Sequence, residues 1–254
     1  MQPAETAIAF RAVSYQVRNG REVLHDVTFE IPSGEILVLL GRSGSGKTTA
    51  LKLVNRLLEP SHGEIVVHGR PTRDWDTIPL RRHTGYAIQE VGLFPHYRVG
   101  RNIALLPEIE NWPKERIAER VKELLKLVGL DPEIAERYPH QLSGGQRQRV
   151  GVARALAADP PILLMDEPFG ALDPLTRADL QHEFLSLQQK LNKTVLFVTH
   201  DVREALLLGT RIALLEAGRL VACQSRHAFL HSSDALVRRY LETLGEISEK
   251  RGPA

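Results

Sequence analysis

Residues 41–48 combine glycine, hydroxyl and lysine side chains at a spacing that suits the binding of phosphate groups. They read Gly-Arg-Ser-Gly-Ser-Gly-Lys-Thr. The glycines let backbone N–H groups approach a phosphate without a Cβ atom in the way, and the positive end of the following helix adds to the attraction. The run has the pattern of a P-loop and predicts a bound nucleoside triphosphate. The residues expected at the triphosphate are Gly41, Arg42, Ser43, Gly44, Ser45, Gly46, Lys47, Thr48 and Thr49.

The side chains of this loop have distinct expected roles. Lys47 can reach the outer phosphates as a point charge, and the Thr48 hydroxyl is placed to ligate Mg²⁺. Ser43 and Thr49 are expected to add hydrogen-bond donors. The alternative interpretation is a glycine-rich turn that contains an incidental lysine.

The flanking sequence supplies the context that a P-loop requires. Residues 36–40 form an uninterrupted apolar run, which is typical of a strand buried on both faces. Leu51, Val54, Leu57 and Leu58 recur at helical spacing just after the loop. A strand, a loop and an amphipathic helix in this order favour the P-loop over the incidental turn.

Two acidic residues follow another apolar run, residues 162–165. A bound triphosphate needs a carboxylate to hold the Mg²⁺ shell, and hydrolysis benefits from a second carboxylate that polarises water. We assign Asp166 to the metal and Glu167 to the water. A polar strand end or helix start is the alternative.

A second glycine-rich turn occupies residues 142–146, Leu-Ser-Gly-Gly-Gln, at the predicted start of a helix. Ser143 is expected to be the N-cap, with Val150, Ala153 and Ala157 on one face of the helix behind it. Such a turn is another potential anion site. One chain rarely needs two sites for one phosphate, so this one would suit a nucleotide held by another subunit. A capped helix without a ligand is the alternative.

The apolar patterns indicate an α/β fold with a mostly parallel sheet. Residues 13–17 and 27–31 alternate as in an antiparallel β edge ahead of the P-loop, and the pattern from 92 to 158 is mainly helical. Doubly buried strands return at residues 162–165, 195–198 and 212–215, with helical patterns at 180–191 and 202–208 between them.

Ligands bind at the carboxyl ends of the strands in a sheet of this kind. Gly41, Asp166 and His200 each follow shortly after an apolar strand. One crevice is therefore expected to hold all three residues.

Composition excludes several classes of protein. The 254 residues suffice for one large domain or two small ones, and the net charge of +2 comes from interspersed charges without the basic block of a nucleic-acid binder. The single Cys223 excludes an intrachain disulfide and fits a reducing compartment. No apolar run approaches the roughly 18 residues of a membrane span, and the N-terminus lacks a signal-peptide pattern. We expect a chain that neither spans a membrane nor is exported.

Together these residues resemble the ATP-binding subunits of ABC transporters. The P-loop, the Leu142–Gln146 signature, the paired acids, Ala171-Leu172-Asp173 and His200 occur in that family's order, over about residues 8–230. The resemblance implies a P-loop NTPase (RecA-like) core with an inserted helical subdomain. We expect a single ABC ATPase domain over 1–254, with the core at about 1–88 and 159–220, the insertion at 89–158 and a short C-terminal extension at 221–254.

The resemblance also implies roles for individual residues. Tyr15 matches the aromatic residue that stacks on adenine, Gln89 the glutamine that contacts Mg²⁺ and the attacking water, and His200 the histidine that contacts the γ-phosphate. Glu167 matches the general base. Family members work as head-to-tail pairs, so a homodimer is expected in which the signature acts on the partner's ATP. The residues implied at that junction are Ser143, Gly144, Gly145, Gln146 and Asp173.

The stretches 54–60, 88–96 and 173–177 are similar to the glycine betaine and osmoprotectant (quaternary amine) importer subgroup. This similarity implies an integral membrane permease as partner, docked near residues 94–103, and a solute-binding protein as an indirect one. It implies a peripheral location on the cytoplasmic face of the cell membrane. Many subgroup members carry C-terminal CBS modules that sense ionic strength; this sequence ends soon after Leu244, so we expect no direct osmotic gating by this subunit.

Other functions remain open at this point. The chain would also suit an ABC ATPase for another small solute, a soluble ABC ATPase in DNA repair or translation, or an exporter motor. A nucleotide-dependent binding module without turnover is a further alternative, which the presence of Glu167 and His200 disfavours.

Overall fold

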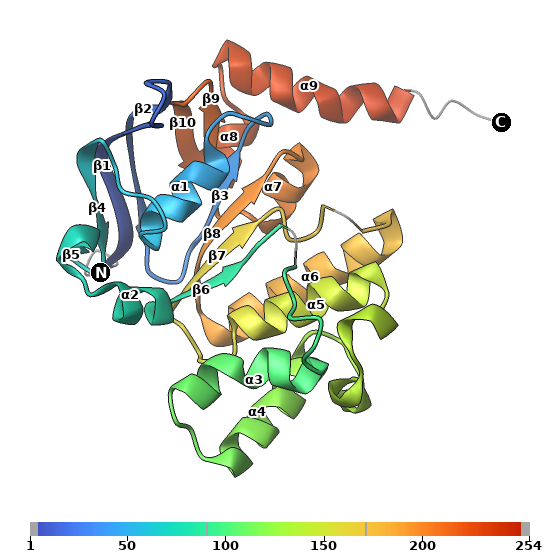
Figure 1. The fold of residues 1–254 in the computed structure, drawn as a ribbon. Helices are drawn as coiled ribbons and strands as arrows, with labels where there is room; N and C mark the ends of the chain where they lie inside the picture. Colours follow the sequence, from blue (N-terminus) through green and yellow to red (C-terminus); the bar gives the residue numbers. More distant parts are fainter. Residues whose placement is uncertain (1–4, 90, 171, 250–254) are drawn as a thin grey trace. The chain divides into compact units, whose positions relative to one another are not determined.

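A computed structural model describes residues 5–89, 91–170 and 172–249 (Figure 1). The chain divides into two compact units, which are described separately below. Unit 1 contains residues 1–80 and 194–254, and unit 2 contains residues 81–193. Unit 2 is therefore wider than the helical insertion expected at 89–158, because strands and a further helix group with the inserted helices. The single-domain assignment stays a prediction. Glu90 and Ala171, which belong to the motifs quoted above, lie outside the described residues.

Unit 1 contains the antiparallel sheet expected ahead of the P-loop. Its order is β2-β1-β4-β5, with β1 at Thr6–Gln16, β2 at Glu22–Pro32, β4 at His62–Val67 and β5 at Arg70–Pro71. Apolar side chains alternate along β2 and point into a buried face, where the rings of Phe10 and Phe29 stack at 4.4 Å. The short helix η1, Thr72–Asp74, follows β5, and α2, Thr77–His83, crosses the boundary between the units.

A second sheet in unit 1 carries the P-loop. Its strands are ordered β10-β9-β3-β8, with β3 at Ile36–Leu40, β8 at Thr194–Thr199, β9 at Arg211–Glu216 and β10 at Arg219–Ser225. β3 pairs in parallel with both β8 and β9, and every residue of β3 and β8 is buried, as the unbroken apolar runs predict. The helices of this unit are α1 (Lys47–Val54), α7 (Val202–Leu208), α8 (Arg226–Leu230) and α9 (Ala235–Glu249).

The helix after the P-loop is shorter than the apolar spacing predicts. α1 ends at Val54, and Leu57 is 48% exposed, so the expected stripe through Leu57 and Leu58 is wrong. The reason is a chain reversal: Arg56 has a positive φ of 51°, and the N–H groups of both leucines donate to the carbonyl of Lys52. These bonds close the end of the helix instead of extending it.

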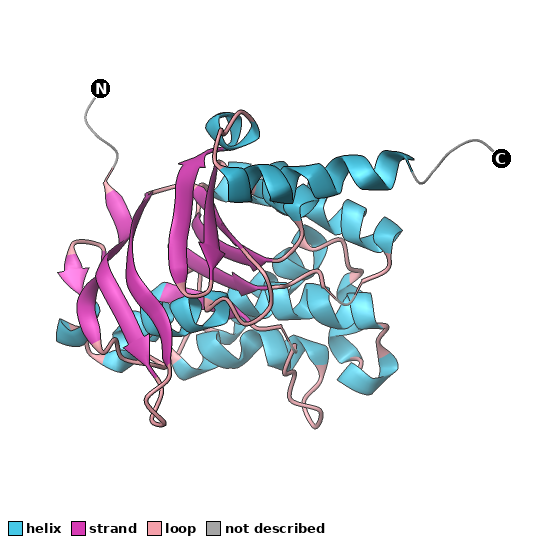
Figure 2. Ribbon diagram, turned by 90° about the horizontal axis from the view of Figure 1, so that it is seen from above, coloured by secondary structure: helices cyan, strands magenta, loops and turns pink. Residues whose placement is uncertain are grey.

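Unit 2 combines a short parallel strand pair with helices. β6 (Thr84–Ala87) pairs with β7 (Ile162–Asp166), and Ala87 lies opposite Met165. The helices are α3 (Val99–Ile109), α4 (Lys114–Leu127), η2 (Pro132–Glu136), η3 (Pro139–Gln141), α5 (Gly144–Ala155) and α6 (Pro174–Leu191). Along α4 and its C-cap, Val121, Leu124, Leu125 and Val128 are buried and Ile117 is half-buried, so these residues form one apolar stripe. Figure 2 distinguishes helices from strands by colour. Within the described part of the chain, no helix is long and apolar enough to cross a membrane.

Candidate functional site

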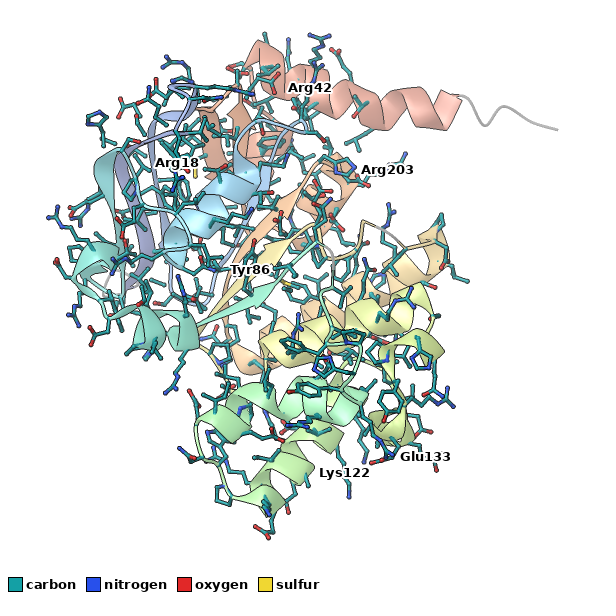
Figure 3. The ribbon with its side chains drawn as sticks, viewed as in Figure 1. Arg18, Arg42, Tyr86, Lys122, Glu133 and Arg203 are labelled. Carbon is teal, nitrogen blue, oxygen red and sulfur yellow. The ribbon has the colours of Figure 1, made fainter. Side chains whose placement is uncertain are left out.

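The ammonium group of Lys47 is held inside the glycine-rich loop. Lys47 is 5% exposed, and its Nζ donates to the carbonyls of Gly41 and Arg42, at 2.8 Å each. A positive charge fixed in this way, close to an exposed Gly44, gives the loop the electrostatics of an anion site. Arg42 is labelled at this loop in Figure 3.

Three glycines of the loop meet different requirements. A Cβ atom at Gly41 would lie 2.2 Å from the carbonyl oxygen of Leu215, and one at Gly46 would lie 2.6 Å from Cδ2 of Leu24. Gly44 has open space around it but a φ of +80°, a backbone conformation that favours glycine. β9 and β2 therefore fix the two ends of the loop, while its middle stays open to a ligand.

Strand pairing places Tyr15 and His200 close to the P-loop: Tyr15 through the β1–β2 pair, and His200 through the β3–β8 pair. Tyr15 pairs with Leu24, whose side chain contacts Gly46. Leu40 pairs with Thr199 in parallel, so Gly41 and His200 leave the sheet at the same edge. The crevice expected to hold these two residues together with Asp166 stays a prediction. His200 is exposed, whereas Tyr15 is half-buried.

The paired acids have contrasting environments in unit 2. Asp166 ends the buried strand β7 and is 3% exposed, and the Tyr86 hydroxyl lies 3.5 Å from its Oδ2. Burial raises the pKa of Tyr86 well above its usual value, and the charge of Asp166 and this hydrogen bond add to the rise. Tyr86, labelled on β6 in Figure 3, thus stays a protonated donor to Asp166 at neutral pH.

Glu167 adopts an uncommon backbone conformation immediately after the strand. Its φ is 45°, in the left-handed region that non-glycine residues seldom occupy. Nε2 of Gln89 lies 3.5 Å from Oε2 of Glu167. Strain of this kind is often found at functional residues, and here it sets a half-buried carboxylate beside an amide donor.

The second glycine-rich turn begins a helix, as predicted. Ser143 is the N-cap of α5: its Oγ accepts from the Gln146 N–H at 3.2 Å, and Gln146 Oε1 accepts from the Ser143 N–H at 3.0 Å. This reciprocal pair is a capping box. Asp173 is likewise the N-cap of α6, and its hydrogen bonds with Thr176 lower the pKa of the carboxyl.

A cavity of about 420 Å³ joins the signature to Asp173 within unit 2. A Cβ atom at Gly145 would lie 3.2 Å from side-chain atoms of both Leu172 and Thr176. Asp173 thus lies beside the signature of its own chain, and its expected place at the junction between two subunits stays a prediction. The lining residues are Gly129, Leu130, Ser143, Gly144, Gly145, Gln146, Arg149, Leu172, Asp173 and Thr176.

The donor sets fit a magnesium nucleotide. The described residues contain no cluster of three or more His, Cys, Asp or Glu side chains that could hold a metal ion by itself. Mg²⁺ is typically held by one or two protein oxygens together with substrate phosphates and water. The half-buried Thr48 of unit 1 offers a hydroxyl oxygen of this kind, and the buried Asp166 of unit 2 offers a carboxylate. The P-loop belongs to unit 1 and the paired acids belong to unit 2.

Sequence reasoning missed two residues of unit 2. Tyr86 contacts the candidate metal ligand Asp166, and Arg154 of α5 donates to two carbonyls just after Gln89. Both contacts join segments far apart in the chain. The available signals were weak: an aromatic residue three positions before Gln89, and a charge beside the apolar face of the signature helix.

A comparison with known protein families identifies the family to which this chain belongs. Residues 24–170 match the ABC transporter family. The chain belongs to this family. This chain is 53% identical over 209 residues to the glycine betaine/carnitine/choline transport ATP-binding protein OpuCA of Bacillus subtilis. The match covers 82% of this chain and 55% of that protein.

Two further relatives are also named as ATP-binding proteins of osmoprotectant or glycine betaine uptake. This chain is 52% identical over 243 residues to the osmoprotectant import ATP-binding protein OsmV of Salmonella typhimurium, covering 91% of this chain and 64% of that protein. It is 50% identical over 214 residues to the glycine betaine uptake system ATP-binding protein YehX of Escherichia coli, covering 84% and 69%. The chain thus spans little more than half the length of some of these curated relatives.

Comparison with solved structures establishes the fold of this chain. A post-hydrolysis dimer of the ATP-binding cassette MJ0796, bound to ADP and Pi, is 33% identical with a TM-score of 0.78, covering 86% of this chain and 98% of that one. The cbiO1 protein of Clostridium perfringens, part of the cbiONQ transporter complex, is 25% identical with a TM-score of 0.83, covering 96% and 99%. The predicted α/β fold, a P-loop NTPase core with an antiparallel sheet and additional helices, is confirmed.

Proposed function

We propose that this chain is the ATP-hydrolysing motor subunit of a multi-subunit ABC importer. The observation that carries the proposal is the cluster in unit 2: a buried Asp166, a left-handed Glu167 directly after it, and Gln89 at 3.5 Å from the Glu167 carboxylate. A protein that only binds the nucleotide would need the P-loop but no carboxylate placed to activate water. A carboxylate held beside an amide has the chemistry to orient and deprotonate water.

In the proposed reaction, Lys47 and the loop amides hold the β- and γ-phosphates. Thr48, Asp166 and Gln89 would hold Mg²⁺, and the bound ion would neutralise the charge that develops on the phosphate oxygens. Glu167 accepts a proton from the attacking water, whose oxygen forms a bond to the γ-phosphorus. The bond from that phosphorus to the β–γ bridging oxygen breaks, and ADP and phosphate are released. His200 contacts the γ-phosphate, and Tyr15 stacks on the adenine.

We further propose that two copies form a head-to-tail dimer. The cavity at the signature presents Ser143 and the glycine amides at the start of α5 within a single unit, and Asp173 lines the same cavity. Such a helix start suits the γ-phosphate of a nucleotide held by the partner. The structure of MJ0796 with ADP and Pi is dimeric, which supports the pairing of two copies. Closure with ATP and opening after hydrolysis would then drive the cycle.

The proposed cargo is a quaternary amine osmoprotectant such as glycine betaine, choline or proline betaine. Support comes from the names of the relatives at 50–53% identity, which describe glycine betaine, carnitine, choline and osmoprotectant transport. The proposed partners are integral membrane permease subunits and, indirectly, a solute-binding protein. The subunit would lie peripherally on the cytoplasmic face of the cell membrane.

Affinity purification from detergent-solubilised membranes tests the transporter assignment. The tagged chain should co-purify with a polytopic permease, identified by mass spectrometry, and with a binding protein whose ligand can be assayed. Phe94, 40% exposed in the expected docking segment, should be needed, so Phe94→Glu should lose the permease. Leu230→Glu, at a site in unit 1 that is 46% exposed, is the matched control and should retain it. Recovery with only soluble repair or ribosomal proteins would contradict the transport function.

A further inference from the structure

The helix that begins with the signature ends against the segment that follows Gln89. Arg154, in the last turn of α5, donates from Nη2 to the carbonyl of Val91 at 2.7 Å and from Nη1 to the carbonyl of Gly92 at 2.8 Å. Both distances are short for N–H···O bonds, as expected for a charged donor. One guanidinium therefore holds two consecutive carbonyls.

A second contact lies one turn earlier on the same helix. A Cβ atom at Gly151 would lie 2.7 Å from Cγ1 of Val91, so α5 approaches this segment too closely for a larger residue. Gly151 and Arg154 are three positions apart and share one face of the helix. The segment 91–92 is thus fixed to α5 by a polar contact and a packing contact, which reinforce each other.

The chemistry of this contact requires arginine. The planar guanidinium offers several N–H donors in a fixed fork, whereas a lysine ammonium is a point donor on a flexible chain. Burial lowers the pKa of Arg154, yet a guanidinium remains charged at neutral pH. A buried charge is costly unless its donors are satisfied, and the two carbonyls supply partners.

The segment held by Arg154 is also close to the candidate catalytic carboxylate. Gln89 lies two residues before Val91, and its Nε2 is 3.5 Å from Oε2 of Glu167. Within unit 2, one contact joins Glu167 to Gln89, and a second set joins residues 91–92 through Arg154 to α5, whose N-cap is Ser143.

We propose that Arg154 is a positioning residue that couples the two nucleotide sites of the dimer. The inference rests on the proposed function, in which Gln89 and Glu167 act on the subunit's own ATP and the start of α5 acts on the partner's ATP. Arg154 makes the Gln89 segment and the signature helix move as one element. Occupation of one site then favours the orientation of Ser143 that completes the other site.

The test measures ATP-driven pairing in a Glu167→Gln background, which holds the dimer before hydrolysis. Arg154→Lys should weaken pairing at least tenfold, about 1.4 kcal/mol, while ATP binding to the isolated monomer changes less than about twofold. The readouts are the monomer–dimer equilibrium by sedimentation against ATP concentration, and nucleotide affinity measured below the pairing concentration.

Arg120→Lys is the matched control. Arg120 donates to the carbonyls of Leu156 at 2.9 Å and Ala157 at 3.3 Å, immediately beyond α5, so it makes the same kind of contact without touching residues 91–92. The proposal predicts a similar loss of thermal stability for both variants and a loss of pairing for Arg154→Lys alone. Equal losses of pairing would show that general damage to α5 is responsible and would overturn the inference.

A second variant covers the case in which Arg154→Lys does not fold. Gly151→Ala presses on Val91 and should also weaken pairing while monomer ATP affinity stays within about twofold; normal pairing would overturn the inference. If the Glu167→Gln parent fails to pair with ATP, the proposed dimer is wrong and the inference is wrong with it. That outcome differs from one in which the parent pairs and Arg154→Lys pairs equally well.

Discussion

The hydroxyl of Tyr86 lies 3.5 Å from Oδ2 of Asp166, and the two residues belong to neighbouring parallel strands of unit 2. Asp166 is the carboxylate proposed for the metal shell, and it is almost fully buried. The hydroxyl offers it a donor that keeps its proton, because burial and the adjacent negative charge both raise the pKa of Tyr86. Tyr86 therefore stabilises a buried charge and fixes its orientation.

This relationship predicts a pH dependence of stability. Unfolded tyrosine loses its proton near pH 10, whereas folded Tyr86 keeps it to a higher pH. Above pH 10 the unfolded state thus binds fewer protons than the folded state, and the free energy of unfolding falls as pH rises. Urea titrations between about pH 8 and 11 should show a steeper fall for the wild type than for Tyr86→Phe. Parallel curves for the two proteins would contradict the raised pKa.

A comparison of Gly44, in the middle of the P-loop, with Gly69 distinguishes the effect of backbone strain on stability from the effect on ATP binding. Gly44 (φ +80°) and Gly69 (φ +73°) both have open space where a Cβ atom would lie, and Gly69 belongs to the turn before β5. Gly44→Ala and Gly69→Ala should each lower the free energy of unfolding by about 1–2 kcal/mol, the cost of a left-handed alanine. Only Gly44→Ala should weaken ATP binding in calorimetry. Equal ATP affinity for both variants would place the phosphates elsewhere.

The signature serine should act in the partner's site. Ser143→Arg should leave ATP binding by isolated monomers unchanged and abolish ATP-driven pairing, because a bulky cation would fill the cavity at the start of α5. Ser143→Thr retains an oxygen for the capping bond to Gln146 and should fold and pair normally. Size-exclusion chromatography with ATP measures the pairing. If Ser143→Arg pairs like the wild type, the signature does not act in trans.

Local patterns sufficed for the elements that position the site. The unbroken apolar run at 36–40 and the buried strands β7 and β8 follow directly from their composition, and the capping box at Ser143 follows from residue types at fixed spacing. The helix end after Val54 was not predicted, because Leu57 continues the apolar period even though Arg56 reverses the chain. The spacing of apolar residues does not reveal a left-handed backbone conformation when the residue that adopts it, here Arg56, is not glycine.

Long-range contacts explain what the sequence did not disclose about the candidate site. Arg154 contacts carbonyls 62 and 63 positions away, and Tyr86 contacts a carboxylate 80 positions away. Such contacts depend on how β6, β7 and α5 pack, which no local pattern specifies. The roles given to Gln89 and His200 came from the family resemblance and stay predictions.

The most direct test of the central claim compares ATP binding and ATP hydrolysis in two variants, Lys47→Ala and Glu167→Gln. Lys47→Ala should weaken ATP binding, because it removes the ammonium that the loop holds with two carbonyls. Glu167→Gln should bind ATP like the wild type and hydrolyse it at least tenfold more slowly, about 1.4 kcal/mol of barrier for each tenfold loss. Near-normal turnover by Glu167→Gln would contradict its assignment as the general base, and a wild-type chain that binds ATP without hydrolysing it would contradict the account of this chain as an ATP-hydrolysing motor.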